Sequence, residues 1–279
     1  MAKILDGRIV RDEIKSELIK RVSRLGFSPC LTVVQVGNLP ASTSYIGQKI
    51  KFGEAIGVKV KHLCFSNNIS LDELKNEILK LNQDNSVRGI IVQLPLPPQL
   101  DVWEVIETID PKKDVDGLTA INLKKLWARQ STLIPATARG VLTLLDYYKI
   151  VIAGKRVVVV GRSNLVGGPI ALAMLNRGAT VTVCHRQTKD LASITKTAEI
   201  LISATGHPGL ITSAEVSPRQ VVIDVGLTVS TGGGLVGDVA YAEVAKTVSA
   251  ITPVPGGVGP MTVCSLFMNL LDVCENLKK

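Results

Sequence analysis

The sequence has 279 residues, 46% of them hydrophobic, which is enough to bury a full core and is typical of a soluble protein of two domains. Its 32 Lys and Arg exceed its 24 Asp and Glu, but the net charge of +8 is spread along the chain and only 4% of residues are aromatic. This composition argues against a nucleic-acid partner, and it fits either a small phosphorylated or carboxylated ligand or a solvated basic surface.

The N-terminal stretch, MAKILDGRIV, lacks the apolar core of a signal peptide, and no apolar run approaches the ~20 residues of a membrane span. The five cysteines are far apart and lack CxxC spacing, and the three histidines form no HExxH motif. These features predict reduced thiols, a cytoplasmic location, no membrane segment and no metal site.

A helix is predicted within STSYIGQKIKFGEAIG, residues 42–57. Side-chain hydroxyls can accept from the free N–H groups of a first turn, so we expect the helix to start at Ser42, Thr43 and Ser44. One largely apolar face of this helix contains Tyr45, Lys49, Phe52 and Ile56. Lys49 therefore lies beside Tyr45, either as a functional amine or as a lysine whose apolar stem lets its ammonium group reach water.

Short β-branched runs alternate with helical patterns along the whole chain. The predicted strands are 31–37, 88–95, 155–161, 179–184, 199–206 and 220–226. Clear helical patterns lie between them at 70–83 and 167–178. This alternation predicts an α/β fold in two domains, each with a mainly parallel sheet flanked by helices.

Polar side chains follow the strand at 88–95. Gln93 precedes the prolines that stop this strand, and the turn KKDVDGL supplies Asp114 and Asp116. Because ligands bind beyond the carboxyl ends of strands in open α/β sheets, Gln93, Asp116 and the Tyr45/Lys49 helix can converge on one site. The alternatives are a turn contact for Gln93 and an Asx turn for Asp116.

The boundary between the domains is predicted near TLIPATARG. Thr137 can cap a bridging helix there, and the second sheet begins at Lys155. The last segment forms an amphipathic helix that we expect to pack back on the first half. The predicted domains are therefore residues 1–138 with 262–279, and residues 139–261.

The strand at 155–161 runs into GRSNLVGGP and then a helix. In doubly wound sheets this junction binds a pyrophosphate on the free N–H groups of the helix start, although a plain tight turn has a similar sequence. The next strand ends in His185 and Arg186 with no acidic residue, and Arg162 lies in the preceding loop. Cations without a carboxylate favour NADP over NAD, unless both arginines are simply surface residues.

The chain resembles the bifunctional methylenetetrahydrofolate dehydrogenase/cyclohydrolase family over nearly its full length. The matching stretches, in the family's order and spacing, are ILDG, SYIGQKIKFGEAIGV, GIIVQLPLPP, DPKKDVDGL, VVVVGRSNLVGGP, VTVCHR, VIDVG, GDV and ITPVPGGVGPMT. The resemblance implies that the first domain and a cleft between the domains bind folate, and that the second is a Rossmann-type NADP-binding domain.

The resemblance also implies roles for individual residues. The catalytic residues would be Lys49, Tyr45 and Gln93. The folate would be bound by Tyr45, Lys49, Gln93, Asp116, Pro255, Gly256 and Gly257. NADP would be bound by Gly161, Arg162, Ser163, His185, Arg186 and Leu227. Family members suggest a homodimer that serves one-carbon metabolism and purine biosynthesis, with tetrahydrofolate one-carbon derivatives as substrates.

The implied activity oxidises 5,10-methylenetetrahydrofolate to 5,10-methenyltetrahydrofolate and then hydrolyses it to 10-formyltetrahydrofolate. Apolar surroundings and the cationic intermediate both push the pKa of Lys49 down, and a pKa lowered to ~8 would leave roughly a tenth of the amine neutral at pH 7 for the proton transfers of the second step. The alternatives are a dehydrogenase with weak or lost cyclohydrolase activity, another NADP-linked oxidoreductase, and a non-catalytic sensor. Short-chain dehydrogenases also use Tyr-x-x-x-Lys, but their glycine-rich loop precedes that motif, whereas here it follows.

Overall fold

The computed structural model describes residues 2–130, 133–230 and 232–276. These form two compact units, which we name by their main sheets. The six-stranded unit contains Met1–Asp12 and Thr137–Thr262, and the three-stranded unit contains Glu13–Ala136 and Val263–Lys279. Residues 277–279 of the predicted first domain lie outside the described residues.

The first twelve residues group differently from the sequence expectation, which placed them with the folate domain. Strand β1 (Lys3–Ile4) pairs in parallel with β11 (Ala250–Ile251), and the Leu5 N–H donates to the Ile251 carbonyl at 2.8 Å. Backbone pairing with a strand some 250 positions away cannot be read from such a short segment.

The three-stranded sheet is parallel throughout, as predicted. Its order is β3-β2-β4, with β2 at Cys30–Val36, β3 at Lys59–Phe65 and β4 at Gly89–Val92. The sequence analysis missed β3, because KVKHLCF carries charged residues and lacks a continuous apolar run. The strand lies at the sheet edge, where lysines such as Lys59 and Lys61 hinder pairing with another chain.

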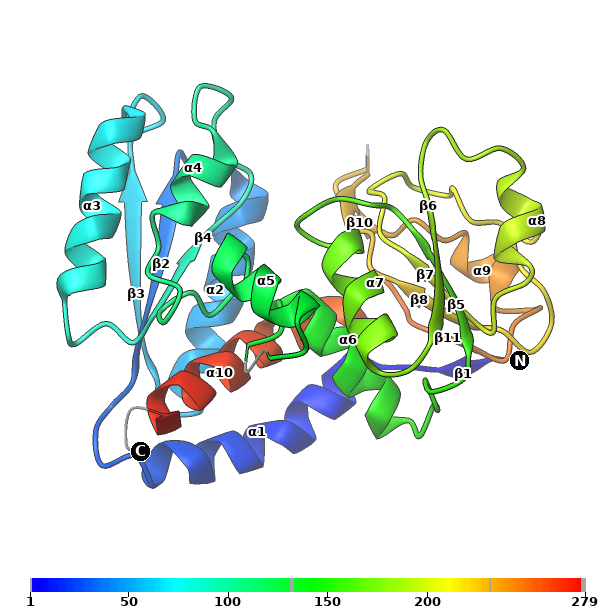
Figure 1. Ribbon diagram of the computed structural model, residues 1–279, viewed down its shortest axis with the longest axis horizontal. Helices are drawn as coiled ribbons and strands as arrows, with labels where there is room; N and C mark the ends of the chain where they lie inside the picture. Colours follow the sequence, from blue (N-terminus) through cyan, green and yellow to red (C-terminus); the bar gives the residue numbers. More distant parts are fainter. Residues whose placement is uncertain (1, 131–132, 231, 277–279) are drawn as a thin grey trace. The chain divides into compact units, whose positions relative to one another are not determined.

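Helices cover both faces of this sheet (Figure 1). Residues Val34 and Ile90 share a core with α3 (Leu71–Gln83) and α4 (Val102–Glu107). Residues Val33 and Ile91 point to the other face and share a second core with α2 (Pro40–Ala55), with α1 (Gly7–Ser23) and with the later part of α10 (Val258–Asn276). A further short helix, α5, spans Ala120–Trp127.

Two helix starts show what local sequence can and cannot specify. Helix α3 begins as predicted, because Ser70 and Glu73 form a reciprocal capping box. Helix α2 begins at Pro40 rather than at the hydroxyl residues. Proline is favoured in the first turn, and the hydroxyl of Thr43 donates to the Leu39 carbonyl at 3.2 Å instead of capping. The predicted start at Ser42 was therefore wrong.

The six-stranded sheet is also entirely parallel, with the order β1-β11-β8-β7-β5-β6. Its other strands are β5 (Arg156–Val160), β6 (Thr180–Cys184), β7 (Ile200–Ser203) and β8 (Val221–Asp224). All four were predicted within a few residues. A separate antiparallel pair is formed by β9 (Thr228–Val229) and β10 (Leu235–Val236).

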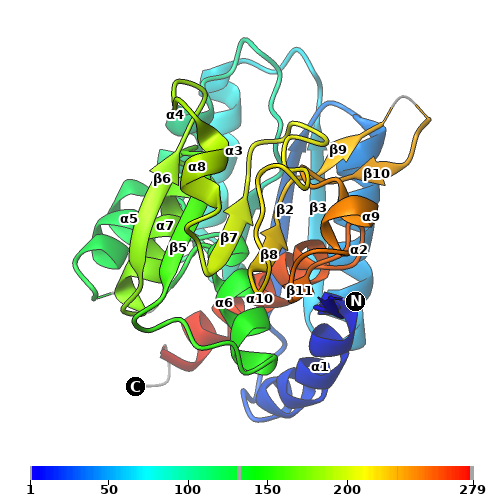
Figure 2. The same cartoon turned by 90° about the vertical axis from the view of Figure 1, so that its right-hand side faces the viewer.

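This sheet too has helices on both faces (Figures 1 and 2). Helices α6 (Ala136–Tyr147) and α7 (Gly167–Asn176) lie on one face, and α8 (Leu191–Thr195) and α9 (Tyr241–Val244) on the other. Because α6 already begins at Ala136, Thr137 lies inside its first turn and is not the cap that the sequence suggested. The two-domain α/β architecture with mainly parallel sheets is confirmed.

Helix α10 is the one helix among the described residues with the length and hydropathy of a membrane span, an exception to the sequence expectation. Of the apolar stretch of α10 that has this hydropathy, 61% is buried inside the protein. Side chains such as Phe267 and Leu270 are fully buried in the core of the three-stranded unit. The hydropathy of α10 is therefore that of a core helix.

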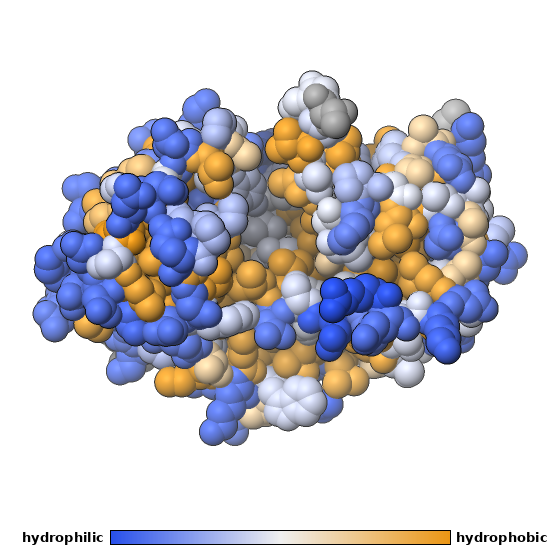
Figure 3. All heavy atoms as spheres, turned by 90° about the horizontal axis from the view of Figure 1, so that it is seen from above, coloured by the Kyte–Doolittle hydropathy of each residue, from blue (hydrophilic) through white to orange (hydrophobic). Residues whose placement is uncertain are grey.

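Hydrophilic and hydrophobic residues are interspersed on the face of the molecule seen in Figure 3.

Candidate active site

Lys49 lies on α2, the helix that follows β2, and contacts the residue that follows β4. Its Nζ donates to Gln93 Oε1 at 2.8 Å. The amide of Gln93 is itself held, since Nε2 donates to the Leu94 carbonyl and the backbone N–H to the Val34 carbonyl, both at 2.8 Å. The predicted convergence of Lys49 and Gln93 is present, and the side-chain oxygen of Gln93 does not serve as a simple turn contact.

The Lys49 amine is buried. The residue is 7% exposed, and Nζ lies 4.9 Å from the centroid of the Tyr45 ring, where the aromatic face can stabilise a cation. Burial lowers the pKa of Lys49 to about 8, while the charge of Asp116 acts in the opposite direction. The alternative of an ammonium group that reaches open water is therefore wrong.

Asp114 and Asp116 have different environments although they are two residues apart. The carboxylate of Asp114 holds the loop that follows it: Oδ1 accepts from the Gly117 N–H, and Oδ2 accepts from the Thr119 N–H and from Asn122 Nδ2, all at 2.8–2.9 Å. The hydrogen bonds that hold the loop backbone thus come from Asp114, two residues before the Asp116 for which the sequence analysis considered an Asx turn.

Asp116 has a shifted pKa. It is partly buried, and burial raises its pKa to about 6, assisted by the charge of Asp114 and opposed by that of Lys49. A bridge between Ile90 and Asp114 places this loop beside β4, the strand that leads to Gln93. Lys49, Gln93 and Asp116 therefore belong to one site in the three-stranded unit.

Asn269 supports this loop and was missed by the sequence analysis. Its Nδ2 donates to the carbonyls of Val115 at 2.8 Å and Ile134 at 2.9 Å, and the residue is fully buried. The available signal was a single amide within the apolar helix LFMNLL. A buried amide needs partners, so an isolated asparagine in a core helix indicates backbone that must be held.

In the six-stranded unit, the glycine-rich turn after β5 packs closely against the neighbouring backbone. Gly161 has φ +114°, and a Cβ there would overlap the carbonyl oxygen of Ala204, while a Cβ at Gly167 would overlap the carbonyl of Gly161. The Ser163 hydroxyl accepts from the N–H groups of Val166 at 3.2 Å and Gly167 at 3.3 Å. The helix start packs on the turn as tightly as a dinucleotide-binding junction requires.

The other predicted cofactor residues follow the carboxyl ends of neighbouring strands in the same sheet. The Gly161 N–H donates to the Cys184 carbonyl at 2.9 Å, which places the end of β6 and His185 beside the turn. His185 is half-buried, with Nδ1 accepting from the Gln187 N–H at 3.2 Å, whereas Arg162 and Arg186 are exposed. Leu227, which follows β8, is 48% exposed.

The predicted Pro-Gly loop is anchored to the N-terminal segment. The Gly7 N–H donates to the Gly256 carbonyl, and the Gly257 N–H to the Pro253 carbonyl, both at 2.8 Å. A Cβ at Gly7 would overlap the carbonyl of Gly257. The loop with Pro255, Gly256 and Gly257 thus lies in the six-stranded unit, apart in sequence and in unit from Lys49.

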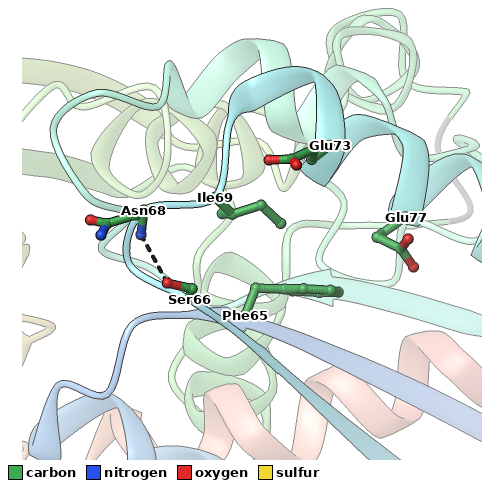
Figure 4. A pocket seen from close by; sticks show the side chains of 6 residues that line it. All are labelled: Phe65, Ser66, Asn68, Ile69, Glu73 and Glu77. Atoms are coloured by element: carbon green, nitrogen blue, oxygen red, sulfur yellow. Dashed lines mark hydrogen bonds between the residues drawn. The ribbon is translucent and has the colours of Figure 1, made fainter.

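A surface hollow elsewhere in the three-stranded unit does not contain these residues (Figure 4). It is lined by Phe65, Ser66, Asn68, Ile69, Glu73 and Glu77. Glu73 is engaged in the capping box of α3, so this hollow carries no catalytic constellation. In the described part of the chain, no group of three or more His, Cys, Asp or Glu side chains is placed to hold a metal ion.

Two family models match this chain in the order of the two sites. The first, "Tetrahydrofolate dehydrogenase/cyclohydrolase, catalytic domain", covers residues 5–116. The second, "Tetrahydrofolate dehydrogenase/cyclohydrolase, NAD(P)-binding domain", covers residues 135–278. The chain belongs to the tetrahydrofolate dehydrogenase/cyclohydrolase family. The resemblance found in the sequence is thereby confirmed, and the Lys49 site lies in a unit that holds most of the family's catalytic domain.

Relatives of this family match the chain over nearly its whole length. "Bifunctional protein FolD 2" of Lactobacillus johnsonii is 47% identical over 269 residues, which is 95% of each chain. The crystal structure of the bifunctional FolD enzyme of Campylobacter jejuni is 42% identical, with a TM-score of 0.96 and coverage of 99% of this chain and 100% of that one. The Trypanosoma brucei FolD structure, "complexed with NADP cofactor and inhibitor", is 36% identical, with a TM-score of 0.95 and coverage of 100% and 99%.

Proposed function

We propose that this protein oxidises 5,10-methylenetetrahydrofolate to 5,10-methenyltetrahydrofolate with NADP and then hydrolyses the product to 10-formyltetrahydrofolate. Family membership over both domains and relatives named as bifunctional enzymes support the two activities. The observation that carries the proposal is the buried Lys49 amine, which contacts Gln93 at 2.8 Å and has its pKa lowered to about 8.

The dehydrogenase step depends on alignment. Bound NADP supplies the hydride acceptor, and no acid or base has to act on the migrating hydrogen. Tyr45 offers a rigid aromatic face beside Lys49 against which a pterin and its p-aminobenzoate group can lie. Asp116 offers a carboxylate to the donor edge of the pterin, in a loop fixed by Asp114 and Asn269.

The hydrolysis step needs proton transfers, which is the role proposed for Lys49. With a pKa of about 8, roughly a tenth of the amine is neutral at pH 7, compared with about one molecule in 2,500 for an ordinary lysine. Neutral Lys49 can take a proton from the water that attacks the methenyl carbon. Gln93 keeps Nζ in place through its Oε1.

The residues of the six-stranded unit fit an adenine dinucleotide. The close approach at Gly161 leaves no room for a side chain, so the backbone can lie against a pyrophosphate. Arg162 and Arg186 are exposed cations just beyond the carboxyl ends of β5 and β6, and β6 ends without an acidic residue. This supports NADP rather than NAD, as does the NADP complex of the Trypanosoma brucei relative.

The cellular setting is also part of the proposal. We infer a cytoplasmic homodimer that requires no metal and supplies one-carbon units to purine biosynthesis. The resemblance to the family supports the dimer and the pathway, and the separated cysteines support a reducing compartment. The spread charge and few aromatic residues support partners other than nucleic acid, and the burial of α10 in the core supports a protein without a membrane segment.

A single spectroscopic assay tests the function. Methylenetetrahydrofolate is mixed with the enzyme and either NADP or NAD, and the methenyl absorbance is followed over time. We expect it to appear faster with NADP and then to decay faster than it does without enzyme. Appearance without accelerated decay would support the alternative of a dehydrogenase with weak cyclohydrolase activity. No methenyl signal with either cofactor would contradict both.

A further inference from the structure

Two acidic residues lie buried in the six-stranded unit, outside the residues assigned above. Asp224 ends β8 within VIDVG, and Asp238 follows β10 within GDV. They are 3% and 0% exposed, respectively. A carboxyl group is almost never fully buried unless hydrogen bonds or charges compensate for the loss of water, so each needs a reason to be there.

Asp238 holds the end of β7. Its Oδ2 accepts from the Ser203 hydroxyl at 2.8 Å and from the Thr205 N–H at 2.7 Å. Its Oδ1 is buried without a hydrogen-bond partner among the described residues. One carboxylate oxygen therefore fixes the backbone just beyond β7, and charge-assisted bonds of this kind are stronger than neutral ones.

Asp224 holds the end of its own strand. Its Oδ1 accepts from the N–H groups of Gly226 and Asp238, and its Oδ2 from the N–H of Val239, each at 3.0 Å. Three backbone donors stabilise the charged form, but burial and the neighbouring Asp238 raise the pKa of Asp224 to about 7. The two acids thus link the segments after β8 and β10.

Two glycines make room for this pair. A Cβ at Gly226 would overlap the carboxyl group of Asp238, and a Cβ at Gly237 would overlap that of Asp224. Each carboxyl group therefore lies directly against the backbone next to the other acid. A side chain at Gly226 would displace Asp238, and a side chain at Gly237 would displace Asp224. The two glycines and the two acids therefore depend on one another.

The carboxyl pair also adjoins the residues predicted to hold the cofactor. Thr205 follows Ala204, whose carbonyl lies where a Cβ of Gly161 would be. Gly226 precedes Leu227. Strands β5 and β7 are neighbours where the strand order reverses, which is the position at which open α/β sheets bind ligands.

We propose that Asp238 is a positioning residue of the dinucleotide site: it fixes Thr205 and thereby the Ala204 backbone that packs on Gly161, while Asp224 fixes Gly226 and Leu227. The inference rests on the proposed NADP-dependent function. Asp238 acts through these segments and does not itself touch the cofactor. This positioning role explains why the buried acids of the VIDVG and GDV stretches occur beside glycines.

The test is Asp238→Asn, which keeps the shape of the side chain and removes its charge. We expect the Kd for NADP, measured by calorimetry, to rise about tenfold or more. Cyclohydrolase activity, assayed from methenyltetrahydrofolate without NADP, should stay within about twofold, because Lys49 lies in the other unit. A matched control is Asp146→Asn, which alters a half-exposed acid paired with Arg177 and should leave the Kd unchanged.

Ser203→Ala provides a milder second test, since it removes one donor to Asp238 and leaves the Thr205 N–H. We expect its Kd for NADP to rise about two- to fivefold, and this variant decides the matter if Asp238→Asn does not fold. The inference is overturned if the variants bind NADP as the wild type does, or if cyclohydrolase activity falls in parallel with binding. A wild type that neither binds NADP nor forms the methenyl product would instead overturn the proposed function.

Discussion

The two candidate sites occupy equivalent places in the two sheets but are built from different parts of the chain. In the three-stranded unit, Gln93 follows β4, where β2 and β4 meet and the strand order reverses. In the six-stranded unit, Gly161 follows β5 at the corresponding reversal beside β7. The first site consists of buried side chains with shifted pKa values, and the second of closely packed backbone with exposed cations nearby.

This difference shows what each kind of chemistry requires. Proton transfer requires a titratable group whose pKa has been moved toward neutrality, and burial of Lys49 supplies that shift. Binding of a pyrophosphate requires backbone N–H groups that can be approached closely, and Gly161 supplies that space. If the roles are divided in this way, each activity can be damaged while the other survives.

The largest effect is expected from Lys49→Met, which keeps an apolar stem and removes the amine. Cyclohydrolase activity should fall by about 10²–10⁴-fold, the usual contribution of a general base. Hydride transfer should persist in part, because it needs alignment only. Both activities are measured separately, starting from the methenyl and the methylene substrates.

A matched control is available on the same helix. Lys51→Met makes the same chemical change at an exposed lysine two positions away, and it should leave both activities near the wild-type level. Equal loss of the two activities in Lys49→Met would refute the division of roles.

The converse experiment is Gly161→Ala. Its Cβ would overlap the Ala204 carbonyl and force a φ of +114° on a residue with a side chain, so we expect the KM for NADP to rise about 10- to 100-fold while cyclohydrolase activity is retained. Gly154→Ala is the control, since Gly154 also has a positive φ (+76°) but nothing within 4 Å of its Cβ position. A similar rise in KM in both variants would attribute the effect to backbone strain alone.

The pH dependence of the two reactions should also differ. Below its pKa of about 8, the neutral fraction of Lys49 grows about tenfold per pH unit, and above it the fraction levels off. Asp116, with its pKa of about 6, is already ionised over most of this range. Enzyme-catalysed hydrolysis should therefore follow Lys49, rising from about pH 6.5 to 8 and then flattening. Hydride transfer should lack this slope, and a flat hydrolysis profile in this range would exclude Lys49 as the base.

The sequence predicted those features that depend on local patterns. Apolar β-branched runs identified β5 to β8, and the helical pattern over 70–83 identified α3. The helical spacing that places Lys49 beside Tyr45 is also local. The contact with Gln93 was predicted as a convergence of strand ends, and its role came from the family resemblance.

The features that were missed depend on partners far away in the sequence. Strand β1 is defined by pairing with β11, and the alternating, charged β3 by its place at a sheet edge. Asn269 and Asp238 are meaningful only through the backbone they hold, at Val115 and Thr205. Such residues can be noticed in a sequence as polar groups in apolar surroundings, but their partners require the structure.

The smallest effect is expected at Arg186, which is exposed after β6. An exposed charge contributes little, so Arg186→Ala should raise the KM for NADP about two- to fivefold. The KM for NAD should not change, because NAD lacks the 2′-phosphate that a cation at this strand end contacts. Lys189→Ala, an exposed cation three residues further on, is the matched control. Added salt should weaken NADP binding less in Arg186→Ala, which keeps Arg162, than in the wild type, whereas equal changes for NADP and NAD would exclude Arg186 as the phosphate contact.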